Sequence, residues 1–469
     1  MTPVYIDTCC CCCCCLLYLT AAANTLMTGV YTSCMSHWYP QRYSWHVGAL
    51  SSSLRLLLGV IVVLVAVGPV MARKQLPTFP QYPHHDEVVK LAVSQNNFTR
   101  DLYVQIAQRS SRNLFFSPFS IVMAMGMTHA GTAGNTEKEV HAVLHLSQDK
   151  DAMHNAFQDI VTDLKTEAAD YELRTSNMAY VSHKMTLLSN FECILKEKYL
   201  SYAKTVNFEE SEKVKQEIND AVEKETNSRI KNLIPSGILD SLTRMVLVNA
   251  IYFKGLWENQ FKKSDTHDQM FWLSESESVK IPMMNVKSDF HLKHNKDLDA
   301  DILALDYKGS RLSMVLVLPT KRDGLAELEA KLATTDLNDL GKRMHKSKVV
   351  VTLPKFKLEE SLFLNEHLAK MGIKDLFDVN HCDLSGITGT NDLYVSHVIH
   401  KAFLEVNEEG SEAAAATAVV IKMRSLPKPP HTFIADHPFF FCIRDEQSGF
   451  ILFSGRFIHP EFVSSKDEL

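Results

Sequence analysis

The chain has 469 residues, of which 46% are hydrophobic and 22% are charged, as in ordinary globular proteins. Lys and Arg number 49 against 55 Asp and Glu, so the formal net charge is −6 at pH 7. Because no long basic run accompanies this acidic balance, we expect no nucleic-acid partner. The length allows one large domain or several smaller ones.

The eleven cysteines are unevenly distributed along the chain. Seven of them form the run 9–15 and another is Cys34, which leaves Cys193, Cys382 and Cys442 for the rest of the sequence. Three cysteines permit at most one internal disulfide, so the sequence does not indicate a disulfide-stabilised scaffold. Cys442 lies in an apolar run and is predicted to be a buried thiol in a strand, not a nucleophile.

The N-terminal region predicts a targeting signal. Residues 1–53 show no helical or strand periodicity and form an unassigned extension. Residues 54–72 follow the order of a secretory signal, with Arg55, an apolar stretch at 56–67 and a small-residue cleavage site ending at Ala72. The apolar stretch is short for a membrane span, so no stable span is expected. Because a signal peptide belongs near the first residue, two explanations stay open: a reading frame extended upstream of the true start, or an uncleaved signal anchor.

The C-terminal tail, residues 462–469, ends in a retrieval motif for the endoplasmic reticulum, formed by Lys466, Asp467, Glu468 and Leu469. We therefore predict the KDEL receptor as a partner. The predicted location is the lumen of the endoplasmic reticulum or the secretory pathway, with secretion left open. Asn97 begins a glycosylation sequon, which fits a luminal glycoprotein.

Residues 86–461 have an even composition without linker, charge block or repeat, so they are predicted to form one domain. In chain order, helical spacing appears at 88–109, a helix start at 117–120 and helical spacing again at 213–233. Strand-like runs follow, at residues 245–253, 312–318, 349–353, 439–443 and 450–453. Because helices and strands are intermixed without βαβ alternation, the sequence predicts an α+β fold with mainly antiparallel sheets.

The sequence contains none of the common enzyme motifs, such as G-x-S-x-G, H-E-x-x-H, a P-loop or G-x-G-x-x-G. His397 and His400 are three residues apart in a strand-like stretch, where they would face opposite sides and could not share a metal. His84 and His85 lie in a polar segment next to a proline and are expected to be solvated. We therefore expect no enzyme activity, no cofactor and no metal.

Residues 408–427 carry the most information about function. The alanines favour a helix, but the β-branched residues 419–421 and the prolines after them argue against one. Read with a period of two, one face holds only small or apolar residues, namely Ser411, Ala413, Ala415, Thr417, Val419 and Ile421. The other face holds Glu412, Lys422 and Arg424 among alanines and Val420. The segment therefore suits two states, an exposed loop and a buried strand, although a flexible surface loop could have the same composition.

Several blocks between residues 86 and 461 resemble the serpin family, and they follow the family's order. The blocks are 113–120, 247–257, 353–356, 383–386, 400–402 and 436–457. The resemblance implies the serpin fold, a single large domain with helices packed on three mainly antiparallel β-sheets and an exposed reactive-centre loop. The chain departs from the family at Ala221, often a tryptophan, and at Ser228, often a glycine. We expect both departures to loosen the helix that contains them.

The resemblance also implies roles for individual residues. The hinge that enters the central sheet would be Glu408, Glu409, Gly410, Ser411, Glu412, Ala413, Ala414, Ala415 and Ala416. The polar cluster where the sheet opens, called the shutter, would be Ser117, Ser120, Asn249 and His400. At the base of the loop, called the breach, Lys355 would pair with Glu408 near Trp257.

The reactive bond is predicted to be Arg424–Ser425. Glu408 is the seventeenth residue counted back from Arg424, the loop length typical of inhibitory serpins. A basic residue before the bond indicates a trypsin-like serine protease as the target, and Lys422 is the rival site. The resemblance implies a monomeric inhibitor that traps this protease as a covalent complex. Three alternatives stay open: a non-inhibitory serpin chaperone of the endoplasmic reticulum, an inhibitor of proprotein convertases, and an inhibitor of papain-like cysteine proteases.

Overall fold

A computed structural model describes residues 82–165, 171–408 and 429–460, all within one compact unit, Pro77–Leu469. The predicted extension, signal segment and C-terminal tail lie outside the described residues. So do the hinge from Glu409 onward and the bond Arg424–Ser425. The structure therefore bears on the body of the protein and on Glu408, the first residue of the hinge.

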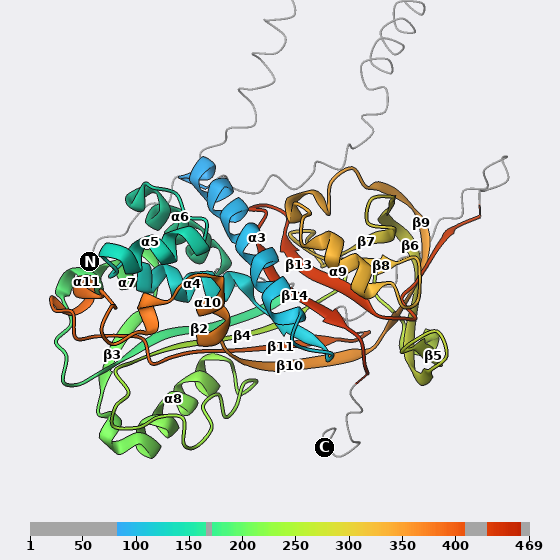
Figure 1. Cartoon of the computed structure of the whole chain (residues 1–469). Helices are drawn as coiled ribbons and strands as arrows, with labels where there is room; N and C mark the ends of the chain where they lie inside the picture. Colours follow the sequence, from blue (N-terminus) through green and yellow to red (C-terminus); the bar gives the residue numbers. More distant parts are fainter. Residues whose placement is uncertain (1–81, 166–170, 409–428, 461–469) are drawn as a thin grey trace, which may run out of the picture. The chain divides into compact units, whose positions relative to one another are not determined.

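Helices are most frequent in the first part of the described chain (Figure 1). The α-helices are α3 (His85–Ala107), α4 (Pro118–His129), α5 (Gly134–Val143), α6 (Lys150–Leu164), α7 (Ser189–Lys198), α8 (Ser211–Glu225), α9 (Leu325–Leu332), α10 (Asn365–Met371) and α11 (Ser385–Thr388). Short 3-10 turns occur at η1 (Phe208–Glu210), η2 (Lys263–Asp265), η3 (Leu337–Asp339) and η4 (Asp375–Phe377). Helix α4 starts as predicted, because the Ser117 side chain accepts a hydrogen bond from the Ser120 N–H and Pro118 occupies the first helical position.

Nine strands form a large sheet in the order β1-β14-β13-β8-β7-β6-β9-β12, with β5 beside β6. They are β1 (Leu114–Phe116), β5 (His267–Trp272), β6 (Ser278–Asn295), β7 (Ala300–Asp306), β8 (Leu312–Pro319), β9 (His345–Pro354), β12 (His431–Ile434), β13 (Phe439–Asp445) and β14 (Ile451–Phe457). Strand β6 pairs with β7 through residues 291–295 and with β9 through residues 283–292. This one long strand therefore joins two of the three expected sheets into a continuous one.

Five strands form the central sheet, in the order β10-β11-β4-β2-β3. They are β2 (Tyr171–Ser182), β3 (Tyr202–Val206), β4 (Met245–Gly255), β10 (Phe356–Phe363) and β11 (His397–Val406). Two neighbouring pairs, β11–β4 and β2–β3, are parallel, and the others are antiparallel. Each strand-like run found in the sequence overlaps a strand of the structure, and the predicted α+β fold with mainly antiparallel sheets is confirmed.

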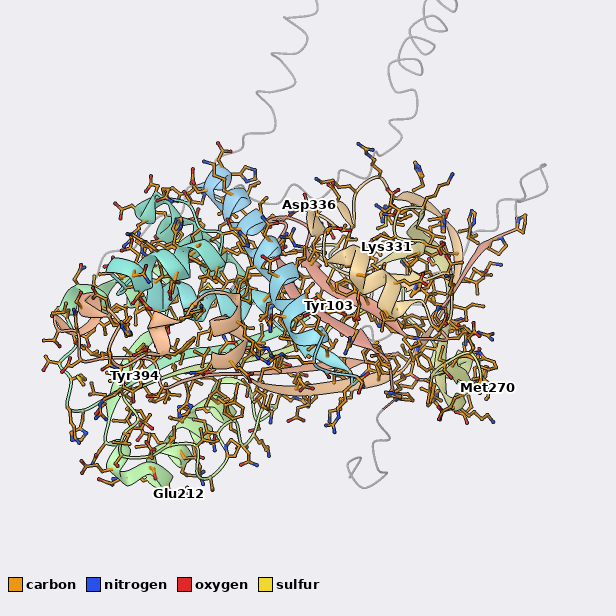
Figure 2. All side chains as sticks on the ribbon, viewed as in Figure 1. Tyr103, Glu212, Met270, Lys331, Asp336 and Tyr394 are labelled. Atoms are coloured by element: carbon orange, nitrogen blue, oxygen red, sulfur yellow. The ribbon has the colours of Figure 1, made fainter. Side chains whose placement is uncertain are left out.

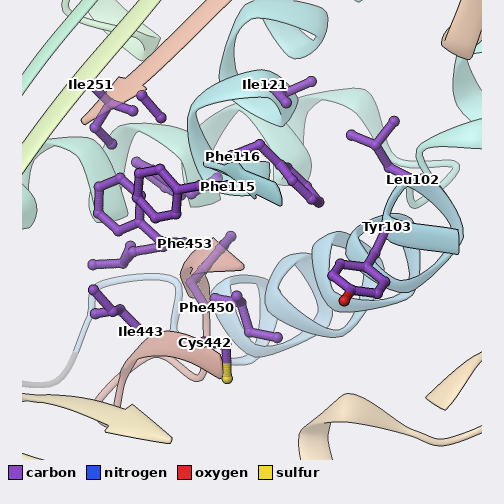
Figure 3. Packing of buried hydrophobic residues seen from close by; sticks show 14 of the residues in the cluster. Leu102, Tyr103, Phe115, Phe116, Ile121, Ile251, Cys442, Ile443, Phe450 and Phe453 are labelled. Atoms are coloured by element: carbon purple, nitrogen blue, oxygen red, sulfur yellow. The ribbon is translucent and has the colours of Figure 1, made fainter. Parts of the chain in front are cut away.

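The main core lies between the two sheets around α4, every residue of which is buried. Phe115 of β1 stacks on Phe453 of β14 with ring centroids 5.3 Å apart, and Phe453 also meets Phe253 of β4 at 5.7 Å. Figure 3 shows Phe115 and Phe453 in the same cluster as Ile251 and Ile443. Each buried ring of this kind contributes about 1.5–3 kcal/mol, so the two sheets and α4 are stabilised as one unit.

Helix α8 covers the other face of the central sheet (Figure 1). Val214, Ile218 and Val222 form its buried stripe, whereas Glu212 points outward (Figure 2). The predicted helical spacing at 213–233 is too long, because α8 ends at Glu225. After that residue the backbone turns through Asn227 and Ser228, whose φ angles of 52° and 58° cannot continue a right-handed helix.

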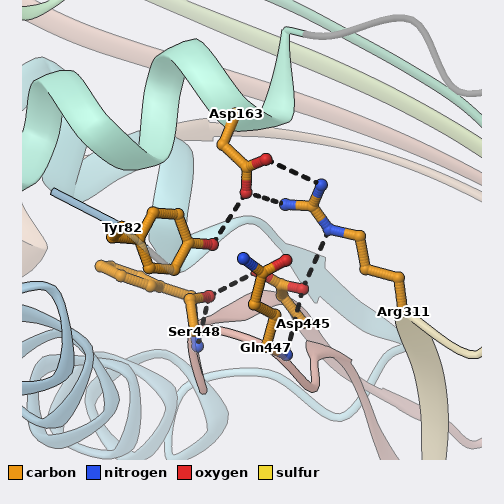
Figure 4. A network of polar contacts seen from close by, with 7 residues as sticks. Tyr82, Asp163, Arg311, Asp445, Gln447 and Ser448 are labelled. Atoms are coloured by element: carbon orange, nitrogen blue, oxygen red, sulfur yellow. Dashed lines mark hydrogen bonds and ion pairs between the residues drawn. The ribbon is translucent and has the colours of Figure 1, made fainter. Parts of the chain in front are cut away.

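A polar network fixes the start of the described body (Figure 4). The Tyr82 hydroxyl donates to Asp163 at the end of α6, at 2.8 Å. Arg311, just before β8, donates to Asp163 at 2.6 Å and to the fully buried Asp445 at 3.2 Å. The Ser448 hydroxyl donates to the other oxygen of Asp445. The network therefore ties the segment before α3 to α6 and to the turn between β13 and β14.

Candidate functional site at the opening of the central sheet

The central sheet contains a parallel seam between β4 and β11. Its register runs from His397 opposite Val246 to Leu404 opposite Phe253. A strand that turned back after β11 would be antiparallel to β11 and, because β4 and β11 are parallel, also antiparallel to β4. Antiparallel pairing is slightly more stable per residue than parallel pairing, so the seam is a place where the sheet could gain a strand.

The predicted shutter residues do come together at this seam. His400 of β11 lies opposite Asn249 of β4, and its Nδ1 is hydrogen-bonded to the Asn249 Oδ1. The Asn249 amide donates to the backbone carbonyl of Ser120 at 2.7 Å and also contacts the Ser120 hydroxyl. The Ser117 N–H donates to the His400 Nε2 at 3.0 Å, and all four residues are buried. The start of α4 is thus hydrogen-bonded across both strands of the seam.

The partners of His400 define its protonation state. Its Nε2 accepts from a backbone N–H, so the ring proton is on Nδ1 and is donated to Asn249. Complete burial lowers the pKa of His400 to about 3, because a charged imidazolium would lose its hydration without gaining an anionic partner. The neutral ring therefore bridges β11, β4 and α4 at physiological pH.

Sequence reasoning missed one member of the shutter, Asn177. It lies on β2 directly opposite Asn249, and its Oδ1 accepts from both the Asn249 amide and the Ser120 hydroxyl. The cluster therefore spans three adjacent strands and the start of α4. A polar amide among the mostly apolar residues that end β2 was the available signal, but only the strand register reveals its partner.

The breach residues also meet as predicted. Glu408 accepts a hydrogen bond from the Thr266 hydroxyl at 2.9 Å, and its other carboxylate oxygen lies 3.5 Å from the Lys355 Nζ. The indole N–H of Trp257 donates to the Asn407 carbonyl at 3.0 Å, while its ring stacks on Tyr307 at 4.4 Å. These contacts hold the chain where it leaves the central sheet.

Opposing effects set the charge of Glu408. Burial alone would raise the pKa of this carboxyl. Its own backbone N–H, the Thr266 hydroxyl and Lys355 outweigh burial, so the pKa is lowered from its ordinary value and Glu408 is ionised at neutral pH. An ionised carboxylate strengthens each of these hydrogen bonds.

The segment after α8 is fastened over the same seam. The Lys401 ammonium on β11 donates to the carbonyl of Lys231 at 2.9 Å and pairs with Glu359 on β10 at 2.8 Å. Ala221 is half-buried against the apolar side chains between α8 and the central sheet, and Ser228 adopts the left-handed conformation that glycine tolerates best. Residues of this segment pack in one apolar cluster with residues of both β4 and β11, so a strand entering between the two strands would widen the sheet under the segment.

Other residues named from the sequence have plainer positions. Cys442 is buried in β13, and burial raises the pKa of its thiol to about 12, as expected for an unreactive strand residue. Asn97 lies within α3, and its sequon residue Thr99 is fully buried and bonded to Gln95. An oligosaccharyltransferase could therefore reach this sequon only before α3 packs.

Two kinds of feature are absent from the described ranges. No helix there is long and apolar enough to cross a bilayer. No group of three or more His, Cys, Asp or Glu side chains in the same ranges is arranged to hold a metal ion.

The central sheet therefore has a parallel pair of strands, β4 and β11, that could accept a further strand between them. The shutter hydrogen-bonds this pair together, and the breach holds the chain where it leaves the sheet. The family model described as "Serpin (serine protease inhibitor)" matches residues 93–460. The chain belongs to the serpin family, whose inhibitory members form covalent complexes with their target proteases. The matched range lies within the predicted domain 86–461.

Individual relatives cover nearly all of the same body. Serpin B3 of Homo sapiens is 39% identical over 388 residues, which are 79% of this chain and 99% of the relative. The leukocyte elastase inhibitor of Homo sapiens is 38% identical over 379 residues, covering 79% of this chain and 100% of the relative. Among solved structures, Serpin48 of the insect Tenebrio molitor aligns with a TM-score of 0.71 and 33% identity, over 79% of this chain and 98% of that one.

Proposed function

We propose that this protein traps a trypsin-like serine protease as a covalent complex, after cleavage of its reactive-centre loop between Arg424 and Ser425. The observation that carries the proposal is the parallel seam between β4 and β11, locked by His400 and Asn249 and followed directly by the small-residue hinge. The leukocyte elastase inhibitor among the relatives supports the inhibitory class. The basic Arg424, with its planar guanidinium, supports a pocket that contains a carboxylate.

The chemistry is supplied by the protease. Its serine oxygen attacks the Arg424 carbonyl carbon, forming an ester, and the bond to Ser425 breaks as the new amine takes a proton from the protease's histidine. The freed hinge then turns back after β11 and enters the seam antiparallel to both neighbours. The ester-linked protease is carried along with the hinge before water can hydrolyse the ester.

The energy for this movement comes from the sheet. Entry of a strand breaks one parallel ladder along a seam of eight aligned pairs and forms two antiparallel ladders in its place. At about 1 kcal/mol for each net hydrogen bond, and 1.5–3 kcal/mol for each large apolar side chain buried, the gain is on the order of 10 kcal/mol. The intact protein is then a kinetically trapped state, held by the shutter and by the segment after α8.

The cellular location of the protein is a further part of the proposal. We place it in the endoplasmic reticulum and early secretory pathway, returned by the KDEL receptor through residues 466–469, with a glycan added at Asn97 before folding. Support comes from the signal-like stretch at 54–72 combined with the tail. We further propose that the protein acts as a monomer.

The decisive experiment uses trypsin as the probe protease and a denaturing gel as the readout. Wild-type protein should give a covalent complex that survives detergent. Ser411→Arg should be cut without forming a complex, because an unpaired guanidinium would have to be buried in the sheet at a cost of several kcal/mol. Arg424→Ala should give no complex, whereas Lys422→Ala should behave almost like wild type.

The alternative functions predict different bands on the denaturing gel. A non-inhibitory chaperone, the reading that the retrieval tail favours, would be cleaved by trypsin in wild-type form without any complex. Complex formation with papain or a proprotein convertase, but not with trypsin, would show that the target is a cysteine protease or a convertase instead of a trypsin-like protease. A C-terminal fragment that begins at Met423 instead of Ser425 in the mass spectrum would overturn the assignment of the reactive bond.

A further inference from the structure

Two aromatic side chains meet across the seam on the face opposite the shutter. Tyr252 of β4 and Phe403 of β11 are partners in the strand register, and their ring centroids lie 5.3 Å apart. Side chains along a strand alternate between the two faces, so Tyr252 points to the α8 side whereas Asn249 points to α4. Both aromatic side chains are buried. The seam therefore has a contact on each face, polar on one and aromatic on the other.

A cation lies over each of the two rings. The Arg229 guanidinium, from the segment after α8, lies 5.3 Å from the centroid of the Tyr252 ring. The Lys357 ammonium of β10 lies 4.9 Å from the centroid of the Phe403 ring. A cation within about 6 Å of an aromatic ring is attracted by the negative face of the ring. These four side chains, which we call the aromatic clasp, therefore connect β10 through β11 and β4 to the segment after α8.

The clasp lies at the end of the seam where the loop begins. The aligned pairs of β4 and β11 end at Phe253 and Leu404, so Tyr252 and Phe403 are the last pair but one, and β11 ends at Val406. Neighbouring strands lie about 4.8 Å apart, so an entering strand would move β4 and β11 to about 9.6 Å apart and would separate the two rings. A strand that enters from the loop end would therefore have to open the clasp before it reaches the shutter.

The contact depends on the ring of Tyr252 and not on its hydroxyl. This buried hydroxyl has no hydrogen-bond partner among the residues that the structure describes. Burial raises the pKa of Tyr252 to about 12, so the hydroxyl is uncharged at neutral pH. Phenylalanine should therefore replace Tyr252 without loss of the clasp. Leucine should lose both the contact with Phe403 and the attraction to Arg229, since both need an aromatic ring.

We propose that Tyr252 and Phe403 are positioning residues that control the start of strand entry. Their contact holds the loop end of the seam closed in the intact protein, and its opening is a barrier in addition to the shutter. The proposal rests on the proposed function, because that function requires a strand to enter the seam. Entry of a strand requires no protease, so the two proposals can be tested separately.

The probe is a fluorescein-labelled synthetic peptide with the sequence of residues 408–421, added to the intact full-length protein. The rate of peptide entry is measured on native gels that separate bound from free peptide over time. Tyr252→Leu and Phe403→Leu should each take up the peptide about threefold to tenfold faster than wild type, the factor expected for loss of one aromatic pair. The double variant should be no faster than the single variants, because either change alone removes the pair. Tyr252→Phe should keep the wild-type rate.

Tyr180→Leu is the matched control. Tyr180 is buried among the same apolar side chains between α8 and the central sheet, but it lies on β2 opposite Val246, away from the seam. This variant loses a buried ring just as Tyr252→Leu does, so a general loss of packing would accelerate both to the same extent. We expect Tyr180→Leu to keep the wild-type rate of peptide entry.

Equal rates in wild type and both leucine variants would overturn the proposal, as would additive effects in the double variant or equal acceleration by Tyr180→Leu. If the leucine variants fold poorly, the exposed Lys357 decides: Lys357→Met should accelerate entry about twofold to fivefold, and an unchanged rate would overturn the proposal. Peptide entry at the expected rates without a covalent trypsin complex would refute the proposed function and leave the clasp intact. Wild-type protein that takes up no peptide would refute both.

Discussion

The buried His400 predicts that acid weakens the lock on the central sheet. The folded protein requires this ring to be neutral, with a pKa of about 3, whereas in the unfolded chain the ordinary value of 6.5 applies. Because the folded pKa is the lower one, the stabilisation is complete above pH 6.5. It is lost progressively as the pH falls from 6.5 towards 3, where the unfolded chain binds a proton that the folded protein does not.

The magnitude follows from the difference between the two pKa values. Each unit of pH below 6.5 removes about 1.4 kcal/mol, so at pH 4.5 the loss from His400 is about 3 kcal/mol, or up to about 100-fold in a rate constant. His129 and His154 are also buried, and burial lowers the pKa of each to about 4, so they add to the total. A variant of His400 is needed to separate its share.

The variant His400→Gln cannot titrate and still offers one acceptor and one donor to the shutter. The assay is the rate of urea-induced unfolding, followed by tryptophan fluorescence at pH 7 and at pH 4.5. The acid acceleration should be smaller in His400→Gln than in wild type by a factor that approaches 100. His84→Gln, which changes an exposed histidine, should retain the wild-type acceleration. If His400→Gln accelerates in acid as much as wild type does, neutral His400 is not the lock inferred here.

Three further predictions concern Lys401, the reactive-centre loop and the C-terminal tail. Replacing Lys401 by Met removes the bonds to Lys231 and Glu359; we expect a lower melting temperature of the intact protein, by the equivalent of about 1.5–3 kcal/mol, together with faster formation of the protease complex. An unchanged rate would mean that the segment after α8 does not resist entry of the strand. Cleavage within the loop should raise the melting temperature, in contrast to ordinary nicking, and equal or lower stability would favour the chaperone alternative. Deleting residues 466–469 should release the protein into the culture medium, whereas continued retention would implicate residues 1–70 as a membrane anchor.

The shutter illustrates what the sequence could and could not reveal. Ser117, Ser120, Asn249 and His400 were named through the resemblance to serpins, and the structure brings them together. Asn177 was missed because its role depends on lying opposite Asn249, and a strand register is set by long-range pairing that local sequence does not encode.

The fold shows the same division. The sequence predicts strands where apolar or β-branched runs are buried, as in β4 and β8, because a strand buried on both faces consists mainly of apolar residues. The helix predicted at 213–233 was too long, because the apolar spacing continues beyond Glu225 while the backbone turns at Asn227. The union of two expected sheets through β6 could not be predicted, since it depends on which partners each half of one strand finds.

The left-handed turn at Ser228 has a consequence for anyone who engineers this protein. Serine at a φ of 58° is strained by about 1–2 kcal/mol. Ser228→Gly should therefore be selected early when variants are screened for thermal stability. The same substitution would stabilise the segment after α8, whose Lys231 carbonyl accepts a hydrogen bond from Lys401. It would therefore hinder displacement of this segment when the loop enters the sheet. Selection for thermal stability and selection for a high rate of inhibition would then favour different residues at this position. A library screened for heat resistance alone would become enriched in stable variants that inhibit slowly.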